Sequence, residues 1–108
     1  MIRVLIERAE KGTVCAFRVE GHARYADPGQ DIVCAGVSAV TVGTVNAVEK
    51  LTGVEMPSKM KNGFLQASVP GNLKEDQQAQ VQLLLESMIV MLHSIEESYG
   101  KYIALEDH

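Results

Sequence analysis

The sequence GHARYADPGQDIVCAGVS, residues 21–38, decides how the chain is organised. It begins where an alternating strand pattern stops, crosses a loop rich in turn-forming residues, and ends inside the first turns of a helix. A histidine, His22, lies at one end of this loop and a cysteine, Cys34, lies at the other. Histidine and cysteine form a thiol nucleophile when folding brings them together. The stretch therefore indicates either an active site or two unrelated residues that border the same loop.

Two strands are predicted on the N-terminal side of this stretch. Residues 2–8 and 13–20 alternate apolar and polar side chains, which is typical of strands with one buried face. Residues 10–13 form a turn cluster between them, so we expect a hairpin. Cys15 alternates with Phe17 and is therefore expected in the core.

A helix is predicted from Ile32 to about Leu51, because apolar residues recur there with a period of about 3.6 residues. Leu51 is expected on its buried stripe. Its many valines and threonines weaken the intrinsic helix propensity, so packing against other elements must hold it. Gly53 suits the C-terminal end of this helix.

A second hairpin is predicted after the helix. Residues 54–60 and 64–69 are strand candidates, and Asn62-Gly63 between them is a strong signal for a tight hairpin turn. Pro57 places the first of these strands at an edge of the sheet or delays its start.

A long helix and a short strand are predicted to end the chain. Asn72 resembles a helix cap, with Glu75 three residues further on, and the helix should run to about Tyr99. Residues 102–105 form the last predicted strand. Met88 and Met91 are interpreted as fillers of core gaps and not as metal ligands. The remaining histidine of this helix, His93, is expected to face solvent.

The order strand-strand-helix-strand-strand-helix-strand predicts an α+β fold in two layers, with a single mixed β-sheet and both helices on one face. The 108 residues fit one domain, residues 1–108. No apolar run reaches the length of a membrane span, and residues 1–7 lack the apolar region of a signal peptide. We therefore expect a cytoplasmic protein without a membrane partner.

Charge and cysteine usage exclude several classes of function. The net charge of −4 argues against direct binding to nucleic acid, which needs a clustered positive surface. The two cysteines are expected to be free thiols in a reducing cytosol. No Cys-x-x-Cys motif is present, so a zinc site has no support in the sequence. We expect no metal site and no cofactor.

The start of the first helix predicts a chemical site. Cys34 falls at the third helical position, where unpaired backbone N–H groups favour an anion and hence a thiolate. The N–H groups of Cys34 and Ala35 are expected to hold an oxyanion. His22 can serve as the base if the loop folds back, and the turn formers Pro28-Gly29 favour this.

Each of these residues also has a plainer interpretation. A cysteine in a helix is more often a small buried apolar residue than a nucleophile. Asp31 either caps the helix or orients His22, and these two roles compete. Ser38, one turn beyond Cys34, either supports the site or bonds the carbonyl of residue 34. Tyr25 is either a surface aromatic residue or a loop contact for an apolar substrate.

The pattern Gly21-His22-Ala23, then Asp31-Ile32-Val33-Cys34-Ala35, then Ser38, resembles the ribosomal-processing cysteine protease family, called Prp. The resemblance covers essentially the whole chain and departs at none of the signature positions. It implies a homodimeric cysteine endopeptidase that removes the N-terminal extension of a large-subunit bacterial ribosomal protein.

The resemblance also implies roles for individual residues. Cys34 would be the nucleophile, His22 the proton donor and acceptor, and Asp31 and Ser38 supporting residues. The loop 23–30 would cover the substrate. Residues expected to contact the substrate are Gly21, Ala23, Tyr25, Gly29 and Ala35.

Two other functions remain open on the residues alone. The loop and the helix start could bind a ribosomal protein or an assembly factor without chemistry. A reactive Cys34 could also be a redox-sensing thiol, because an ionised cysteine is readily oxidised.

Overall fold

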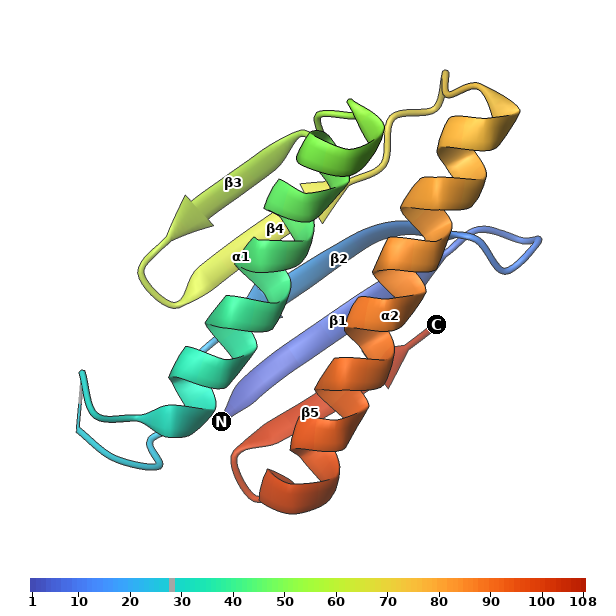
Figure 1. Cartoon of the computed structure of the whole chain (residues 1–108). Coiled ribbons are helices and arrows are strands. Elements are labelled where there is room, and N and C mark those ends of the chain that lie inside the picture. The colour runs from blue at the N-terminus through green and yellow to red at the C-terminus, as the bar shows by residue number, and fades with distance from the viewer. Residues whose placement is uncertain (28) are drawn as a thin grey trace.

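The computed structural model describes residues 1–27 and 29–108. The elements follow one another in the predicted order, and Figure 1 shows their arrangement. In chain order they are β1 (Ile2–Arg8), β2 (Val14–Glu20), α1 (Ile32–Thr52), β3 (Ser58–Lys61), β4 (Phe64–Ser68), α2 (Glu75–Tyr99) and β5 (Ile103–Asp107).

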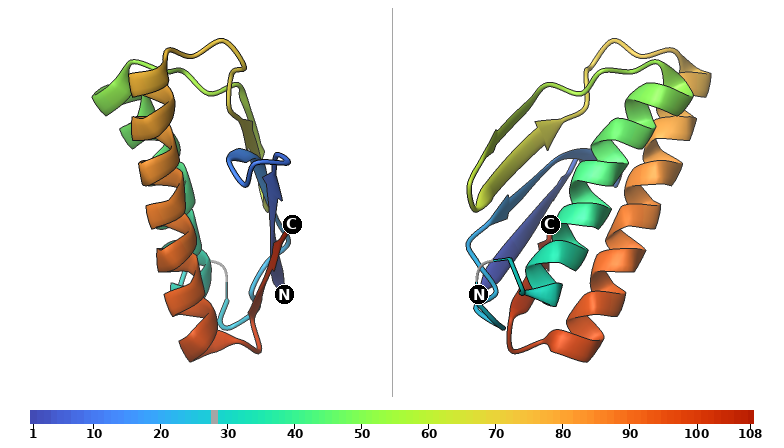
Figure 2. Two further views of the ribbon diagram at one scale, coloured as in Figure 1. Left: turned by 90° about the vertical axis from the view of Figure 1, so that its right-hand side faces the viewer. Right: turned by 60° about the vertical axis from the view of Figure 1, so that its left-hand side comes forward.

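The five strands form one mixed sheet in the order β3-β4-β2-β1-β5. β1 pairs antiparallel with β2 and parallel with β5, while β4 pairs antiparallel with both β2 and β3. Both helices lie on the same face of this sheet, so the molecule has two layers (Figure 2). The predicted α+β class and the two-layer arrangement are confirmed.

The core lies between the helices and the covered face of the sheet. β1 contributes Ile2, Val4 and Ile6, which are at most 3% exposed, as its alternating pattern predicts. Phe17 of β2 is buried among aliphatic side chains. The helices add a row of apolar residues each: Val33, Val37 and Val48 from α1, and Val81, Leu85, Met88, Ile89 and Leu92 from α2.

The buried row of α1 differs from the prediction at its end. Leu51 is 72% exposed, because the row through Thr44 and Val48 continues at the half-buried Thr52 and not at Leu51. The helix ends as predicted at Gly53, whose left-handed φ of 76° suits a glycine cap.

α1 is long and apolar enough to cross a membrane by length and composition, with a mean hydropathy of 1.5. This differs from the expectation based on uninterrupted apolar runs, because polar residues such as Thr41 and Thr44 are spread along the helix. Their hydroxyls donate to the carbonyls of Val37 and Val40 and are thereby satisfied within the helix. Core helices of globular proteins pass the same test, and the buried row of α1 belongs to the shared core.

Cys15 is not a core residue, because β2 carries a β-bulge at this position. Glu7 pairs with Ala16 and Arg8 pairs with Val14, which leaves Cys15 without a partner across the ladder. The bulge shifts the alternation by one residue, so Val14 takes the buried position and Cys15 is half-buried. The Cys15 thiol donates to the Glu7 carbonyl at 3.3 Å.

The second hairpin is shorter than predicted. β3 begins at Ser58 and not at residue 54, and all of its side chains are exposed. Pro57 directly precedes it and cannot donate to a ladder, although its carbonyl accepts the N–H of Ser68 at 3.0 Å. Pro57 therefore delays the start of this edge strand.

The predicted cap of α2 is two residues too early. Lys74, and not Asn72, is the N-cap, and the helix begins at Glu75. The side-chain oxygen of Gln77 accepts the N–H of Lys74 at 3.3 Å, so Gln77 supplies the side chain that folds back onto the helix start.

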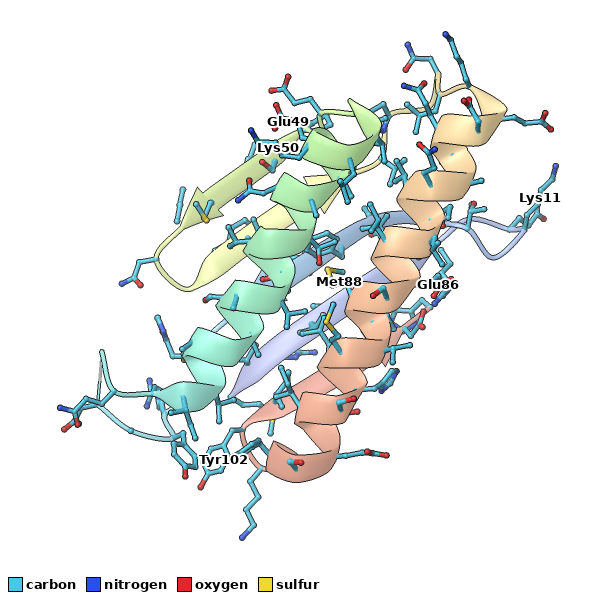
Figure 3. All side chains as sticks on the ribbon, viewed as in Figure 1. Lys11, Glu49, Lys50, Glu86, Met88 and Tyr102 are labelled. Atoms are coloured by element: carbon cyan, nitrogen blue, oxygen red, sulfur yellow. The ribbon has the colours of Figure 1, made fainter. Side chains whose placement is uncertain are left out.

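Two of the three predictions about α2 side chains are correct. Met88 is fully buried, and Figure 3 places it on the side of α2 that faces α1 and the sheet. His93 is exposed as expected, and its Nδ1 lies 3.4 Å from the Glu96 carboxylate. Met91 is 42% exposed and is therefore not a filler of the core.

The arginine at the end of β1 joins three elements. The Arg8 guanidinium donates to both carboxylate oxygens of Glu86 on α2, at 2.6 and 2.9 Å. It also donates to both oxygens of Asp107 on β5, at 2.7 and 3.0 Å. These hydrogen bonds lower the pKa of Glu86 and of Asp107 below their ordinary values. This cluster therefore links β1 to its parallel neighbour and to the helix layer.

Candidate active site

Asp31 fixes the start of α1 and the loop that leads into it. Its Oδ1 accepts the N–H groups of Val33 and Cys34, each at 3.0 Å, which is the geometry of an N-cap. Its Oδ2 accepts the N–H groups of Tyr25 at 2.9 Å and Ala26 at 3.3 Å. Of the two roles left open by the sequence, Asp31 has the capping one, and both carboxylate oxygens are used by backbone donors.

The surroundings of Asp31 favour its charged form. Burial by itself would raise the pKa of this carboxyl. Hydrogen bonds from the backbone of Cys34, Ala26 and Tyr25, together with one from the Cys34 side chain, outweigh burial and lower the pKa. Asp31 is therefore a buried, ionised anchor at the positive end of α1.

The thiol of Cys34 lies in the first turn of α1 and is half-buried. The backbone N–H of Ala23, in the facing loop, donates to its Sγ at 3.3 Å. Because Ala23 directly follows His22 in the chain, this bond brings the backbone of the histidine segment next to the sulfur.

The expected oxyanion donors are already occupied. The N–H of Cys34 donates to the Asp31 side chain, and the N–H of Ala35 donates to the Asp31 carbonyl at 3.0 Å. The prediction that these two groups hold an oxyanion is therefore wrong. The backbone N–H that points at the sulfur is that of Ala23.

His22 is exposed and lies over the turn between β3 and β4. A Cβ atom placed on Gly63 would be only 2.6 Å from His22 Nε2, so the imidazole occupies the space that a side chain at residue 63 would fill. The N–H of Gly21 donates to the Gly63 carbonyl at 2.9 Å. The turn therefore contacts both the backbone and the side chain of the histidine segment.

A cavity of about 910 Å³ is lined by both His22 and Cys34. Of the predicted site residues, His22, Tyr25, Gly29, Asp31, Cys34, Ala35 and Ser38 line it. Gly21 and Ala23 are not among its lining residues. Ala23 is buried, and its N–H faces the thiol. Gly21 has a φ of 92°, and a Cβ atom at this position would collide with the Met1 carbonyl oxygen. The turn expected at Pro28-Gly29 includes Pro28, which lies outside the described residues.

Four further lining residues were not predicted as site residues from the sequence: Arg24, Ala26, Asp27 and Asn62. Arg24, Ala26 and Asp27 belong to the loop between His22 and Cys34, and they line the cavity because this loop borders it. Asn62 comes from the β3–β4 turn, which reaches the site only because β4 pairs with β2. Arg24 has a left-handed φ of 58°, an unfavourable conformation for a side-chain-bearing residue that is concentrated at functional sites.

Three tyrosines gather at the same end of the fold. The ring of Tyr25 meets those of Tyr99 and Tyr102 edge to face, with centroid distances of 5.7 and 5.1 Å. Figure 3 shows Tyr102 at the end of the molecule where α1 begins and α2 ends. These contacts attach the loop to the C-terminal part of the fold.

Comparison with known proteins agrees with this geometry. The family model for cysteine protease Prp matches residues 1–104. The chain belongs to the Prp family of cysteine proteases. The ribosomal processing cysteine protease Prp of Bacillus subtilis is 41% identical over 101 residues, covering 92% of this chain and 90% of that protein.

Two solved crystal structures share the fold of this chain. The crystal structure of an essential ribosomal processing protease Prp from S. aureus, in complex with a covalently linked product peptide, superposes with a TM-score of 0.90 at 34% identity. The match covers 100% of both chains. The crystal structure of SMU.848 from Streptococcus mutans superposes with a TM-score of 0.84 at 25% identity, covering 99% of this chain and 93% of that one.

Membership of the Prp family makes this chain a cysteine peptidase, and its two thiols are in different surroundings. Cys34 and His22 both line the cavity, whereas Cys15 lies on the β2 bulge and is not a lining residue. Within the described residues 1–27 and 29–108, no group of three or more His, Cys, Asp or Glu side chains is placed to hold a metal ion.

Proposed function

We propose that this Prp-family peptidase removes the N-terminal extension of a large-subunit bacterial ribosomal protein, with Cys34 as its nucleophile and His22 as its proton donor and acceptor. The observation that carries the proposal is that the Cys34 thiol and the His22 imidazole line one cavity, with the Ala23 N–H 3.3 Å from the sulfur. Relatives named ribosomal processing proteases support the substrate class.

In the first chemical step the Cys34 thiol gives its proton to His22, and Sγ forms a bond to the scissile carbonyl carbon. The π electrons of the carbonyl move to its oxygen, which becomes an oxyanion next to the sulfur. The Ala23 N–H donates to the sulfur at 3.3 Å, so we expect it to be a backbone donor to this developing charge. This donor replaces the helix N–H groups that Asp31 and the first helical turn occupy.

The second step breaks the peptide bond and the third restores the enzyme. Protonated His22 gives its proton to the leaving amine as the oxyanion collapses to a thioester. Water then gives a proton to His22 and attacks the thioester, which releases the carboxylic product and the Cys34 thiolate. Asp31 supports these steps by holding the loop and the helix start together, and Ser38 borders the cavity one turn further along α1.

We propose that the protein acts in the cytoplasm as a homodimer and that its substrate is a protein. The net charge of −4 favours recognition of the protein extension over direct contact with ribosomal RNA. Arg24, Tyr25, Ala26, Asp27 and Gly29 of the loop line the cavity, so the extension would lie beside these residues when its scissile bond reaches Cys34.

The proposed function is tested with Cys34→Ala and, as a matched control, Cys15→Ala. A peptide carrying the extension is incubated with each protein, and the products are measured by mass spectrometry. We expect cleavage to be lost in Cys34→Ala and retained in Cys15→Ala, since only Cys34 lines the cavity. Cleavage by Cys34→Ala at the wild-type rate would show that this assignment is wrong.

A further inference from the structure

We propose that Gly63, in the turn between β3 and β4, is a positioning residue that holds the His22 imidazole in its catalytic orientation. The inference rests on the proposed role of His22 as proton donor and acceptor. Gly63 itself touches no reacting atom in this proposal; it acts only through the histidine.

The tip of the imidazole lies against the Cα of Gly63. A Cβ built at residue 63 would be 2.6 Å from His22 Nε2, 3.0 Å from Cε1 and 3.3 Å from Cδ2. Real Cβ atoms essentially never approach another atom more closely than 3.0 Å. The imidazole therefore rests where any side chain at residue 63 would have to be, and only glycine leaves that space free.

An exposed histidine needs such a contact to keep one orientation. His22 is exposed, and an exposed side chain samples several rotamers at little cost. Asp31 is not free to orient it, because both carboxylate oxygens accept backbone N–H groups. The turn is the neighbouring surface that restricts the ring.

The turn is itself held in register with the histidine segment. The N–H of Gly21 donates to the Gly63 carbonyl at 2.9 Å, and Glu20 pairs with Phe64 in the sheet. The residues on either side of the His22–Gly63 contact are therefore fixed by backbone hydrogen bonds. A rigid support of this kind is what a catalytic group needs to stay within a fraction of an ångström of its working position.

The test compares Gly63→Ala with Gly53→Ala, which is matched in backbone conformation. Gly63 has a φ of 74° and Gly53 has a φ of 76°, so an alanine at either position carries the same left-handed strain. A Cβ at Gly53 would meet nothing within 4 Å, whereas a Cβ at Gly63 would meet the imidazole. The two variants therefore share the strain and differ in the contact with His22.

The readouts are cleavage kinetics and the alkylation rate of Cys34, measured in a Cys15→Ala background so that Cys34 is the single thiol. We expect Gly63→Ala to lower kcat about tenfold or more with little change in KM, since general acid–base catalysis contributes about 10²- to 10⁴-fold. Alkylation of Cys34 should also slow, because the displaced imidazole can no longer take the proton of the thiol. Gly53→Ala should leave both values near the wild type.

A His22→Ala background separates positioning from a general structural effect. If Gly63 acts through the histidine, Gly63→Ala should no longer change the alkylation rate once His22 is alanine. An alkylation effect that persists in this background, or a Gly63→Ala variant that behaves like Gly53→Ala, would overturn the inference. If His22→Ala alone leaves both cleavage and alkylation unchanged, it is the proposed function that fails.

Two further measurements keep the test decisive if Gly63→Ala does not fold. Gly63→Asn carries a side chain at the same position, and asparagine tolerates the left-handed region better than alanine. The wild-type protein also gives a direct reading by NMR, through a nuclear Overhauser effect between His22 Hε1 and the Gly63 α protons. We expect this signal to be present, and its absence from a spectrum that shows both resonances would overturn the inference.

Discussion

One oxygen of Asp31 accepts the backbone N–H of Tyr25 at 2.9 Å, while its other oxygen caps the helix that carries Cys34. A single carboxylate thus joins the loop on one side of the cavity to the helix on the other. The two functions use different oxygen atoms, so substitutions can separate them.

Asp31→Asn should keep the cap and weaken the loop. Asparagine caps a helix about as well as aspartate, so the unfolding free energy should fall by only a few tenths of a kcal/mol from the loss of charge at the helix end. The amide NH2 group cannot accept the N–H groups of Tyr25 and Ala26, so their amide hydrogens should exchange faster with solvent. Hydrogen exchange measured by NMR checks this, and unchanged exchange at both residues would contradict it.

Asp31→Ala should lose both contacts. The missing cap costs about 0.5–2 kcal/mol of unfolding free energy, measured by urea denaturation. Peptidase activity should fall further than in Asp31→Asn, because the Cys34 N–H loses its acceptor and the start of α1 frays. Equal stability and equal activity of the two variants would argue against the cap.

The stability of the fold should decrease in acid. The pKa of Asp31 is lowered because backbone hydrogen bonds outweigh its burial, and the pKa values of Glu86 and Asp107 are lowered by hydrogen bonds from Arg8. Each carboxyl has a lower pKa in the folded state than in the unfolded state, where ordinary values are about 3.9 for Asp and 4.3 for Glu. Their stabilisation is therefore complete above those values and is lost as the pH falls through the folded-state pKa values.

Arg8→Met should reduce this pH dependence. Removing the guanidinium abolishes the cause of two of the three shifts, so the difference in unfolding free energy between about pH 6 and about pH 3 should become smaller. Arg3→Met is the control, because the Arg3 side chain is 54% exposed against 22% for Arg8, and exposed ion pairs contribute little. Urea denaturation at both pH values measures the difference. A larger change in Arg3→Met than in Arg8→Met would contradict the assignment.

Local signals allowed most elements and the cap to be predicted. The alternation in β1, the period of α1 and the Asn62-Gly63 turn depend on neighbours in sequence, and the structure contains all three. Asp31 as a cap follows from its place directly before the first helical residue. This cap also explains why the helix N–H groups are not the oxyanion donors that were predicted. At a capped helix start, few backbone N–H groups are left without an acceptor.

The remaining features depend on contacts between distant segments. The bulge at Cys15 is set by how β2 pairs with β1, and neither strand's own pattern contains this register. The contact between His22 and Gly63 requires β4 to lie beside β2, an order that no short motif encodes. The thiol and the histidine therefore lie at the two ends of one loop that local patterns predict, whereas no local pattern identifies the turn that lies against the histidine.

Tyr25→Ala should release the loop from the C-terminal part of the fold. Its ring packs edge to face on Tyr99 and Tyr102, and such pairs contribute about 0.5–1.5 kcal/mol each beyond the area they bury. Arg24, directly before it, is exposed and is a site for trypsin. Loss of both aromatic contacts should raise the rate of trypsin cleavage after Arg24 by about tenfold, because cleavage of a loop follows the population of its open form.

The matched control is Tyr25→Phe, which keeps the ring and both edge-to-face contacts and should be cut like the wild type. Lys11 provides an internal reference, since it is exposed in the β1–β2 turn at the opposite end of the molecule from Tyr102 (Figure 3). Cleavage after Lys11 should be unchanged in both variants, and mass spectrometry of the fragments gives the two rates in one experiment. If cleavage after Arg24 in Tyr25→Ala stays at the wild-type rate, the three tyrosines do not hold the loop. If both sites are cut faster in Tyr25→Ala, the substitution has destabilised the whole fold and the tyrosines are not a local loop anchor.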